Sequence, residues 1–159
     1  MGVIDDVILT YTKNSAVFKS DEYTIYTRLI EGKYFAYQKM FTEGEINTCA
    51  SRTALIGAMT RAKMCTEEKQ PAVFQIEDDV LNISIRDKLA DYQEQVPLQE
   101  TVCKSIRLGF DSRLVLETLK AFTCDNIALG FTSPRTPMIV EAEDSDMKAM
   151  VLPVAIREA

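Results

Sequence analysis

Apolar and polar residues alternate with a period of two in three stretches of the chain, and this pattern predicts antiparallel strands with one buried face. Each stretch contains three predicted strands, which cover residues 7–11, 16–18, 23–30, 73–76, 80–85, 89–96, 127–131, 137–140 and 147–154. Asn, Asp, Ser and Pro separate them, as is typical of hairpins. The acidic run Glu77, Asp78 and Asp79 is predicted to be one of these turns.

Two further segments carry apolar residues at helical spacing, and each directly follows another predicted strand, at 45–49 and 104–110. Helices are therefore predicted over 51–64, with Ser51 as N-cap, and over 111–122, with Asp111 as N-cap. The apolar positions are Leu55, Ile56, Met59 and Ala62 in the first helix and Val115, Leu119 and Phe122 in the second. The cations Arg61, Arg113 and Lys120 lie on the opposite sides.

From about residue 43 the pattern is βαβββ-βαβββ, an internal duplication. One amphipathic helix in each half can cover the apolar face of its strands. We therefore expect an α+β fold, a pseudo-two-fold domain with two helices packed side by side inside antiparallel sheets. The opening segment matches the βββ end of the same unit, so the chain is expected to begin within a repeat, as a piece of a longer protein or as a natural short form.

The composition excludes several classes of function. The 159 residues are 47% hydrophobic and 26% charged, as in ordinary globular domains, and contain no histidine. Histidine acid–base catalysis, Ser-His-Asp triads and almost all histidine-containing zinc sites are therefore excluded. The formal net charge of -6 argues against a protein that simply coats DNA or an anionic membrane. No apolar run approaches the length of a membrane span, so a cytoplasmic location is expected.

No cofactor or metal site is predicted. Cys49, Cys65, Cys103 and Cys124 lack CxxC spacing and are expected to be reduced, buried or half-buried thiols. A reactive Cys65 is the less favoured alternative, since no neighbouring cation cluster would lower its pKa. The acidic clusters at 67–68, 77–79 and 141–146 lack the spacing of an EF-hand loop and are interpreted as solvated charges.

Four motifs, in a fixed order, point to one family. They are residues 27–40, residues 51–61, Leu108-Gly109-Phe110-Asp111 and residues 149–156. Together they resemble the bacterial DNA polymerase III beta subunit, the beta sliding clamp. The resemblance implies a DNA-clamp fold in which residues 1–41 are the C-terminal strands of the second clamp domain. Residues 42–159 would be the third, C-terminal clamp domain.

The resemblance also implies a function. A sliding clamp is a DNA polymerase processivity factor, not an enzyme: a homodimeric ring that encircles double-stranded DNA without reading its sequence. It binds peptides from DNA polymerase and from the clamp loader. This chain alone is expected not to close such a ring. Two alternatives stay open: a truncated regulatory paralogue that competes for clamp-binding peptides, and a small thiol- or carboxylate-dependent enzyme of α+β fold.

By the same resemblance, the peptide-binding groove would be formed by Phe35, Lys39, Met40, Asp111, Leu114, Met138, Leu152, Pro153, Val154 and Ile156. The alternative for Met138, Leu152 and Val154 is that they are plain inward-facing strand residues. Arg61, Arg113 and Lys120 would face DNA, or would simply be solvated. Met64 and Cys65 would lie at the subunit interface. The chain departs from the family's usual residues at Phe35, Ala36, Asp111, Leu114 and Ala155.

Overall fold

The computed structural model describes residues 6–65, 70–86, 91–142, 144 and 146–156. The chain forms two compact units, Met1–Ala36 and Tyr37–Ala159. The first unit contains β1 (Ile8–Tyr11), β2 (Ser15–Lys19) and β3 (Thr24–Arg28), which pair antiparallel in that order. All three strands were predicted from the alternation, although β3 is shorter than the predicted 23–30.

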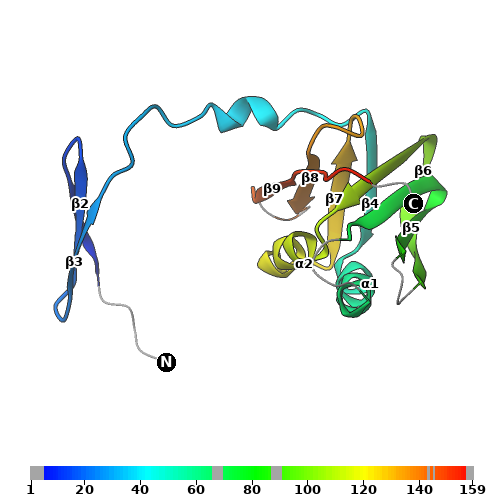
Figure 1. Ribbon diagram of the computed structural model, residues 1–159, viewed down its shortest axis with the longest axis horizontal. Coiled ribbons are helices and arrows are strands. Elements are labelled where there is room, and N and C mark those ends of the chain that lie inside the picture. Colours follow the sequence, from blue (N-terminus) through cyan, green and yellow to red (C-terminus); the bar gives the residue numbers. More distant parts are fainter. Residues whose placement is uncertain (1–5, 66–69, 87–90, 143, 145, 157–159) are drawn as a thin grey trace. The chain divides into compact units, whose positions relative to one another are not determined.

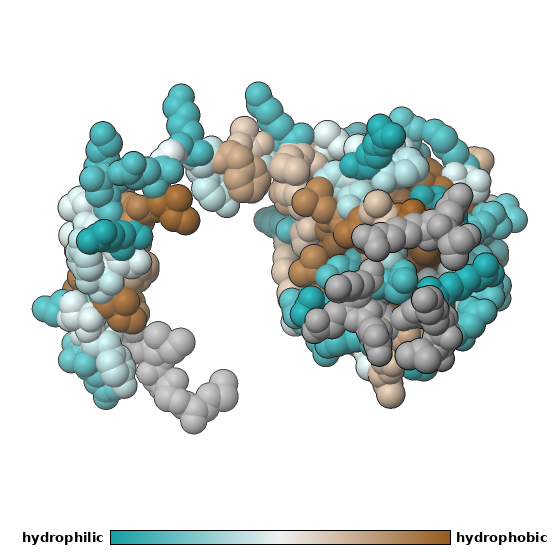
Figure 2. All heavy atoms as spheres, viewed as in Figure 1, coloured by the Kyte–Doolittle hydropathy of each residue, from teal (hydrophilic) through white to brown (hydrophobic). Residues whose placement is uncertain are grey.

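One face of this small sheet carries a row of apolar side chains. Leu9 lies opposite Phe18, and Phe18 lies opposite Ile25, so the three side chains share a face. They are 52%, 39% and 59% exposed. Figure 2 shows hydrophobic side chains, in brown, on the surface of this unit. Within the described part of the first unit, no element covers this face.

The second unit holds the remaining elements: η1 (Tyr37–Met40), β4 (Ile46–Ser51), α1 (Arg52–Met64), β5 (Ala72–Arg86), β6 (Asp91–Phe110), α2 (Ser112–Ala121), β7 (Asn126–Phe131), β8 (Met138–Ala142) and β9 (Lys148–Val151). The six strands form one antiparallel sheet in the order β5-β6-β4-β7-β8-β9. Figure 1 shows α1 and α2 next to each other on the same side of this sheet. Neither described helix has the length and hydropathy needed to cross a membrane.

Both predicted N-caps are confirmed. The Ser51 hydroxyl accepts a hydrogen bond from the Ala54 amide at 3.4 Å. The Asp111 carboxylate accepts from the amides of Arg113 at 2.8 Å and Leu114 at 3.4 Å. These bonds satisfy amides that have no partner inside the helix, so each helix starts where the sequence predicts.

The predicted acidic turn at Glu77–Asp79 is wrong. β5 continues through these residues and pairs with β6 on both sides of them, from Ile76 opposite Ile106 to Val80 opposite Pro97. The pairing register shifts on either side of Asp78, whose φ is 53°. From Ile76 to Val80 the β5 strand advances by four residues, whereas from Ile106 to Pro97 the β6 strand covers nine, so the extra residues of this β-bulge-like irregularity lie on β6, opposite the acidic run. The polar residues of β5 therefore interrupt the regular pairing without reversing the chain.

The predicted strands 89–96 and 104–110 are also parts of a single strand. β6 spans Asp91–Phe110 and pairs with β5 from Arg86 opposite Asp91 to Ala72 opposite Phe110. Leu89 and Ala90 lie outside the described residues. The two halves of the duplication therefore share one long strand, and the last predicted strand, 147–154, is reduced to β9.

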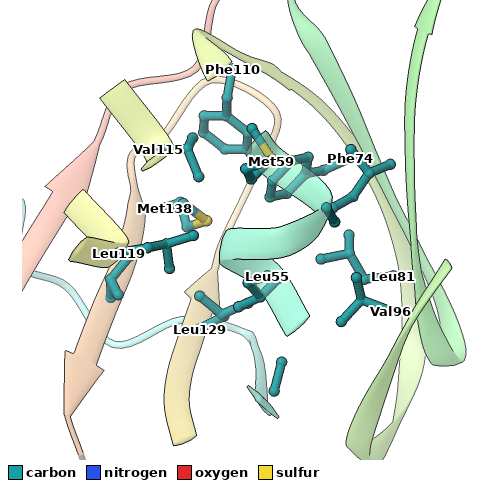
Figure 3. Close-up of a cluster of buried hydrophobic side chains, with 14 of the residues drawn as sticks. Leu55, Met59, Phe74, Leu81, Val96, Phe110, Val115, Leu119, Leu129 and Met138 are labelled. Atoms are coloured by element: carbon teal, nitrogen blue, oxygen red, sulfur yellow. The ribbon is translucent and has the colours of Figure 1, made fainter. Parts of the chain in front are cut away.

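The core lies between the two helices and the sheet. Figure 3 shows Leu55 and Met59 of α1 and Val115 and Leu119 of α2 pointing into this space. All four side chains are at most 1% exposed. Their positions match the apolar stripes predicted from the sequence, although Ile56 is only partly buried against the core. The predicted arrangement of two helices covering antiparallel sheet is confirmed.

After β9 the chain runs back across the sheet, drawn in red in Figure 1, and reaches the end of β6. We call residues 152–156 the tail. The Val154 amide donates to the Gly109 carbonyl at 2.8 Å. A Cβ at Gly109 would lie 2.9 Å from the Val154 carbonyl oxygen and 3.0 Å from Ile156 Cγ1. The absence of a side chain at Gly109 therefore allows the tail to lie directly on β6.

We predict that Gly109→Ala displaces the tail and destabilises the protein, because the new methyl group meets backbone at 2.9 Å. The expected loss is about 1–3 kcal/mol in the free energy of unfolding, the usual range for overpacking. Gly57→Ala is the matched control. Its Cβ would meet only the end of the Arg61 side chain, at 3.2 Å, and alanine favours the helix. Urea unfolding measures both; equal stability of the two variants would contradict the prediction.

Candidate functional site

Three apolar side chains, one near the start of α2 and two on the tail, are exposed. Leu114, Leu152 and Val154 are 50%, 58% and 42% exposed. The backbone of Val154 is hydrogen-bonded to that of Gly109, which lies two residues before the N-cap of α2. In addition, α2 contacts β9, the strand that leads into the tail. Apolar side chains gathered on a surface are typical of interaction sites, whereas isolated ones are not. Leu152 and Val154 are therefore not the inward-facing strand residues of the alternative interpretation.

Met138 was predicted to line the groove, but its side chain is buried in the core. It begins β8, lies opposite Val151 of β9 and is 1% exposed. In Figure 3 its side chain lies within the core cluster, near Val115 and Leu119. The alternative interpretation thus holds for this residue. Met138 supports the strand that leads into the tail and does not itself reach the surface.

The other predicted groove residues lie on the tail, at the N-cap of α2, on η1 and at the end of the first unit. Asp111, Pro153 and Ile156 are half-buried in the second unit. Lys39 is exposed and Met40 half-buried on η1, also in the second unit. Phe35 belongs to the first unit, where its ring stacks on that of Tyr34 at 4.9 Å. Of the residues predicted for the groove, those on the tail and on α2 therefore belong to the second unit, whereas Phe35 belongs to the first.

Arg61 is engaged in an ion pair with the sheet. Its Nε donates to Glu94 Oε2 at 2.8 Å, and its Nη2 donates to Glu94 Oε1. The Tyr92 hydroxyl donates to the same carboxylate and lies 2.9 Å from the Ala58 carbonyl of α1. This network attaches the outer side of α1 to β6. The positive charge of Arg61 is therefore compensated within the unit.

The network shifts the pKa of its members. The hydrogen bond from Arg61, and next that from Tyr92, lower the pKa of the Glu94 carboxyl. Burial is the main cause that raises the pKa of the Tyr92 hydroxyl. Glu94 and Tyr92 were missed by the sequence analysis, which could have noted only that residues two apart on a strand share a face.

The two remaining predicted DNA-facing cations lie on α2. Arg113 is exposed, and its guanidinium is 3.8 Å from the Asp111 carboxylate. Lys120 is exposed and forms no ion pair within the part of the chain that the structure describes. Glu117 is exposed on the same helix. Nearby carboxylates thus partly offset the positive charge on the side of the helices that faces away from the sheet.

The predicted interface and cysteine residues are placed as follows. Met64, the last residue of α1, is 82% exposed, and Cys65 caps the helix through its amide and is half-buried. The cysteines are free thiols, and Cys103 is exposed, contrary to the expectation that all are buried or half-buried.

Among the described residues, no three Cys, Asp or Glu side chains are grouped to hold a metal. Glu67, Glu68 and Glu143 lie outside those residues.

Comparison with known proteins identifies the family. Residues 41–155 match the family model of the DNA polymerase III beta subunit, C-terminal domain. The chain belongs to this family. The resemblance inferred from four sequence motifs is confirmed, and so is the clamp fold.

Curated relatives and solved structures agree with this assignment. The beta sliding clamp of Staphylococcus aureus is 24% identical over 155 residues, which cover 94% of this chain and 41% of that protein. The beta sliding clamp of Halalkalibacterium halodurans is 24% identical over 143 residues, or 87% and 38%. This chain therefore spans about two fifths of the length of these relatives.

Among solved structures, a putative DNA polymerase III beta subunit from Eubacterium rectale has a TM-score of 0.81 at 23% identity. The alignment covers 93% of this chain and 41% of that one. The DNA polymerase sliding clamp from Caulobacter crescentus has a TM-score of 0.85 at 14% identity, over 94% and 41% of the two chains. At these identities the likeness shows the fold.

We predict that Glu94→Gln destabilises the protein at pH 7 and that the difference from the native protein disappears in acid. The folded pKa of Glu94 is lowered, so its stabilising effect is complete above the unfolded value of about 4.3 and is lost as the pH falls through the folded pKa. Urea unfolding between pH 7 and pH 2.5 measures this. Glu100→Gln, on an exposed part of the same strand, is the control. A difference that does not change with pH would contradict the prediction.

Proposed function

We propose that this chain is part of a DNA sliding clamp, the processivity factor of a DNA polymerase, and that residues 42–159 are its third domain. The family match over residues 41–155 carries the proposal. The paired helices on one side of a six-stranded antiparallel sheet support it. Residues 1–41 would then be the C-terminal strands of the second clamp domain, an expectation compatible with a division of the chain at Ala36 and Tyr37.

In this proposal the clamp is a homodimeric ring around double-stranded DNA. Such a ring holds DNA by enclosing it, so its inner surface needs only sparse, loose phosphate contacts. The exposed Arg113 and Lys120 of α2 suit this role, whereas Arg61 is held by Glu94. A chain with a net charge of -6 is compatible with it, because only the inner surface must attract phosphate. Met64 and Cys65 would meet the neighbouring subunit.

The second part of the proposal is that the tail and the start of α2 bind peptides from DNA polymerase and the clamp loader. Exposed Leu114, Leu152 and Val154 offer an apolar surface for the Leu and Phe side chains of such peptides. Gly109 fixes the tail on β6, so the surface is formed before the peptide arrives. The protein would act by binding and not as an enzyme, in keeping with the absence of histidine.

We predict that a fluorescein-labelled peptide containing Gln, Leu and Phe binds this chain with a micromolar Kd, measured by fluorescence anisotropy. Leu152→Asp should weaken the binding at least about tenfold, because a charge would replace an exposed apolar contact. Met64→Asp is the matched control: it adds the same charge at an even more exposed apolar residue, at the end of α1.

Three results would contradict the proposal. These are no binding of the peptide to the native chain, unchanged binding to Leu152→Asp, and equal weakening by Met64→Asp. Circular dichroism of both variants shows whether each is folded. Since both residues are exposed, both variants should keep the native spectrum.

A further inference from the structure

Asp111 connects the end of β6 to the start of α2. It follows Phe110, the last residue of β6, and caps α2 with an extended backbone, at φ -67° and ψ 115°. Neighbouring residues of an extended chain point to opposite sides, so Asp111 and Gly109 share the side opposite to Phe110. The Phe110 ring lies in the core cluster of Figure 3, whereas a Cβ at Gly109 would meet the tail. The Asp111 carboxylate is therefore on the side of the chain on which the tail lies.

The carboxylate of Asp111 uses only one of its two oxygens to cap the helix. Oδ1 accepts from the amides of Arg113 at 2.8 Å and Leu114 at 3.4 Å. Oδ2 lies 3.8 Å from Arg113 Nη2, which is beyond hydrogen-bond distance, and it accepts no hydrogen bond from the residues that the structure describes. The Asp111 side chain is 36% exposed. One oxygen is thus fixed by the helix, and the other can accept a donor from a bound partner.

This acceptor borders the proposed peptide-binding surface. The Leu114 amide donates to Asp111, and the Leu114 side chain is one of the exposed apolar groups of that surface. A carboxylate at the edge of an apolar surface attracts cationic donors and repels other carboxylates. Arg113 offsets this charge only in part, because its side chain is 55% exposed and its guanidinium is 3.8 Å away. The net charge of -6 acts in the same direction as Asp111 at longer range.

We propose that Asp111 selects peptides in which a Lys or Arg flanks the apolar anchors. In the docked complex, Asp111 Oδ2 accepts an N–H from the ammonium or guanidinium group of that residue, whereas an Asp or Glu at the same place is repelled. The inference rests on the proposed peptide-binding function and specifies its ligand. Selection of this kind combines attraction of one class of peptide with repulsion of another, so one flanking residue is enough to produce it.

The test uses five fluorescein-labelled peptides with blocked ends and the same Gln, Leu and Phe core. Two carry Lys directly before or directly after the core, two carry Glu at these places, and one carries Gln at both. In anisotropy titrations at 50 mM salt, the Lys peptide should bind about three- to fivefold tighter than the Glu peptide at one of the two places, the range of an exposed charge pair. This ratio should approach one at 500 mM salt, where the charges are screened.

Variants locate the selection at Asp111. Asp111→Asn and Asp111→Ser both keep a good N-cap residue and remove the charge, so each should bring the ratio between the Lys and Glu peptides close to one. Arg113→Gln should raise the ratio, because it removes the cation that offsets Asp111. Asp125→Asn is the matched control: it removes the same charge at an exposed residue beyond the other end of α2 and should leave the ratio unchanged. Circular dichroism shows whether each variant is folded.

The outcomes separate the two proposals. If the native chain binds the Lys and Glu peptides equally well at both places, the selection is wrong and peptide binding stands. If the Glu peptides bind more tightly and Arg113→Gln removes their advantage, Arg113 makes the selection and this inference is wrong. A ratio that persists in both Asp111 variants, or that falls equally in Asp125→Asn, also contradicts it. If no peptide binds, the proposed function fails, and the inference fails with it.

Discussion

The second unit depends on one constraint: the apolar face of a six-stranded sheet must be covered, and two short helices cover it. Burial of Leu55 and Met59 from α1 and of Val115 and Leu119 from α2 fixes both helices against the sheet. Hydrophobic burial of this kind supplies most of the stability of a domain. It also decides which side of each helix faces outward. The proposed contacts with DNA are a consequence of this packing.

The surface proposed to bind peptides depends indirectly on the same packing, through the strands that lead into the tail. Met138 is buried beneath α2 and holds β8 and β9 in place, and the tail continues from β9. Gly109 then lets the tail lie on β6 beside the helix start. Exposed Leu152 and Val154 are thus displayed on a fixed backbone, which lowers the entropy lost on binding. In the proposed function, the exposed cations of α2 and the apolar surface beside the tail would serve different partners, DNA and peptides, on one scaffold.

Local sequence signals predicted the helices well, because caps and apolar stripes involve residues close in the chain. Ser51 and Asp111 begin their helices as expected. Signals that depend on distant partners were not predictable. The run at Asp78 resembles a turn, yet the pairing of β5 with β6 carries the strand through it. Likewise Arg61 resembles a free cation until β6 brings Glu94 to it. Met138 and Leu152 have similar apolar character in sequence, and only the fold separates the buried residue from the exposed one.

The central claim is that the tail and the start of α2 form the peptide-binding surface of a clamp domain. Amide chemical-shift mapping of the ¹⁵N-labelled protein, during titration with the peptide that contains Gln, Leu and Phe, tests it most directly. The account predicts the largest shifts at Leu114, Leu152 and Val154, with a smaller effect at Gly109 and none at Ser84, on the long β5–β6 hairpin. Largest shifts away from the tail and α2, or no saturable shifts at all, would contradict it.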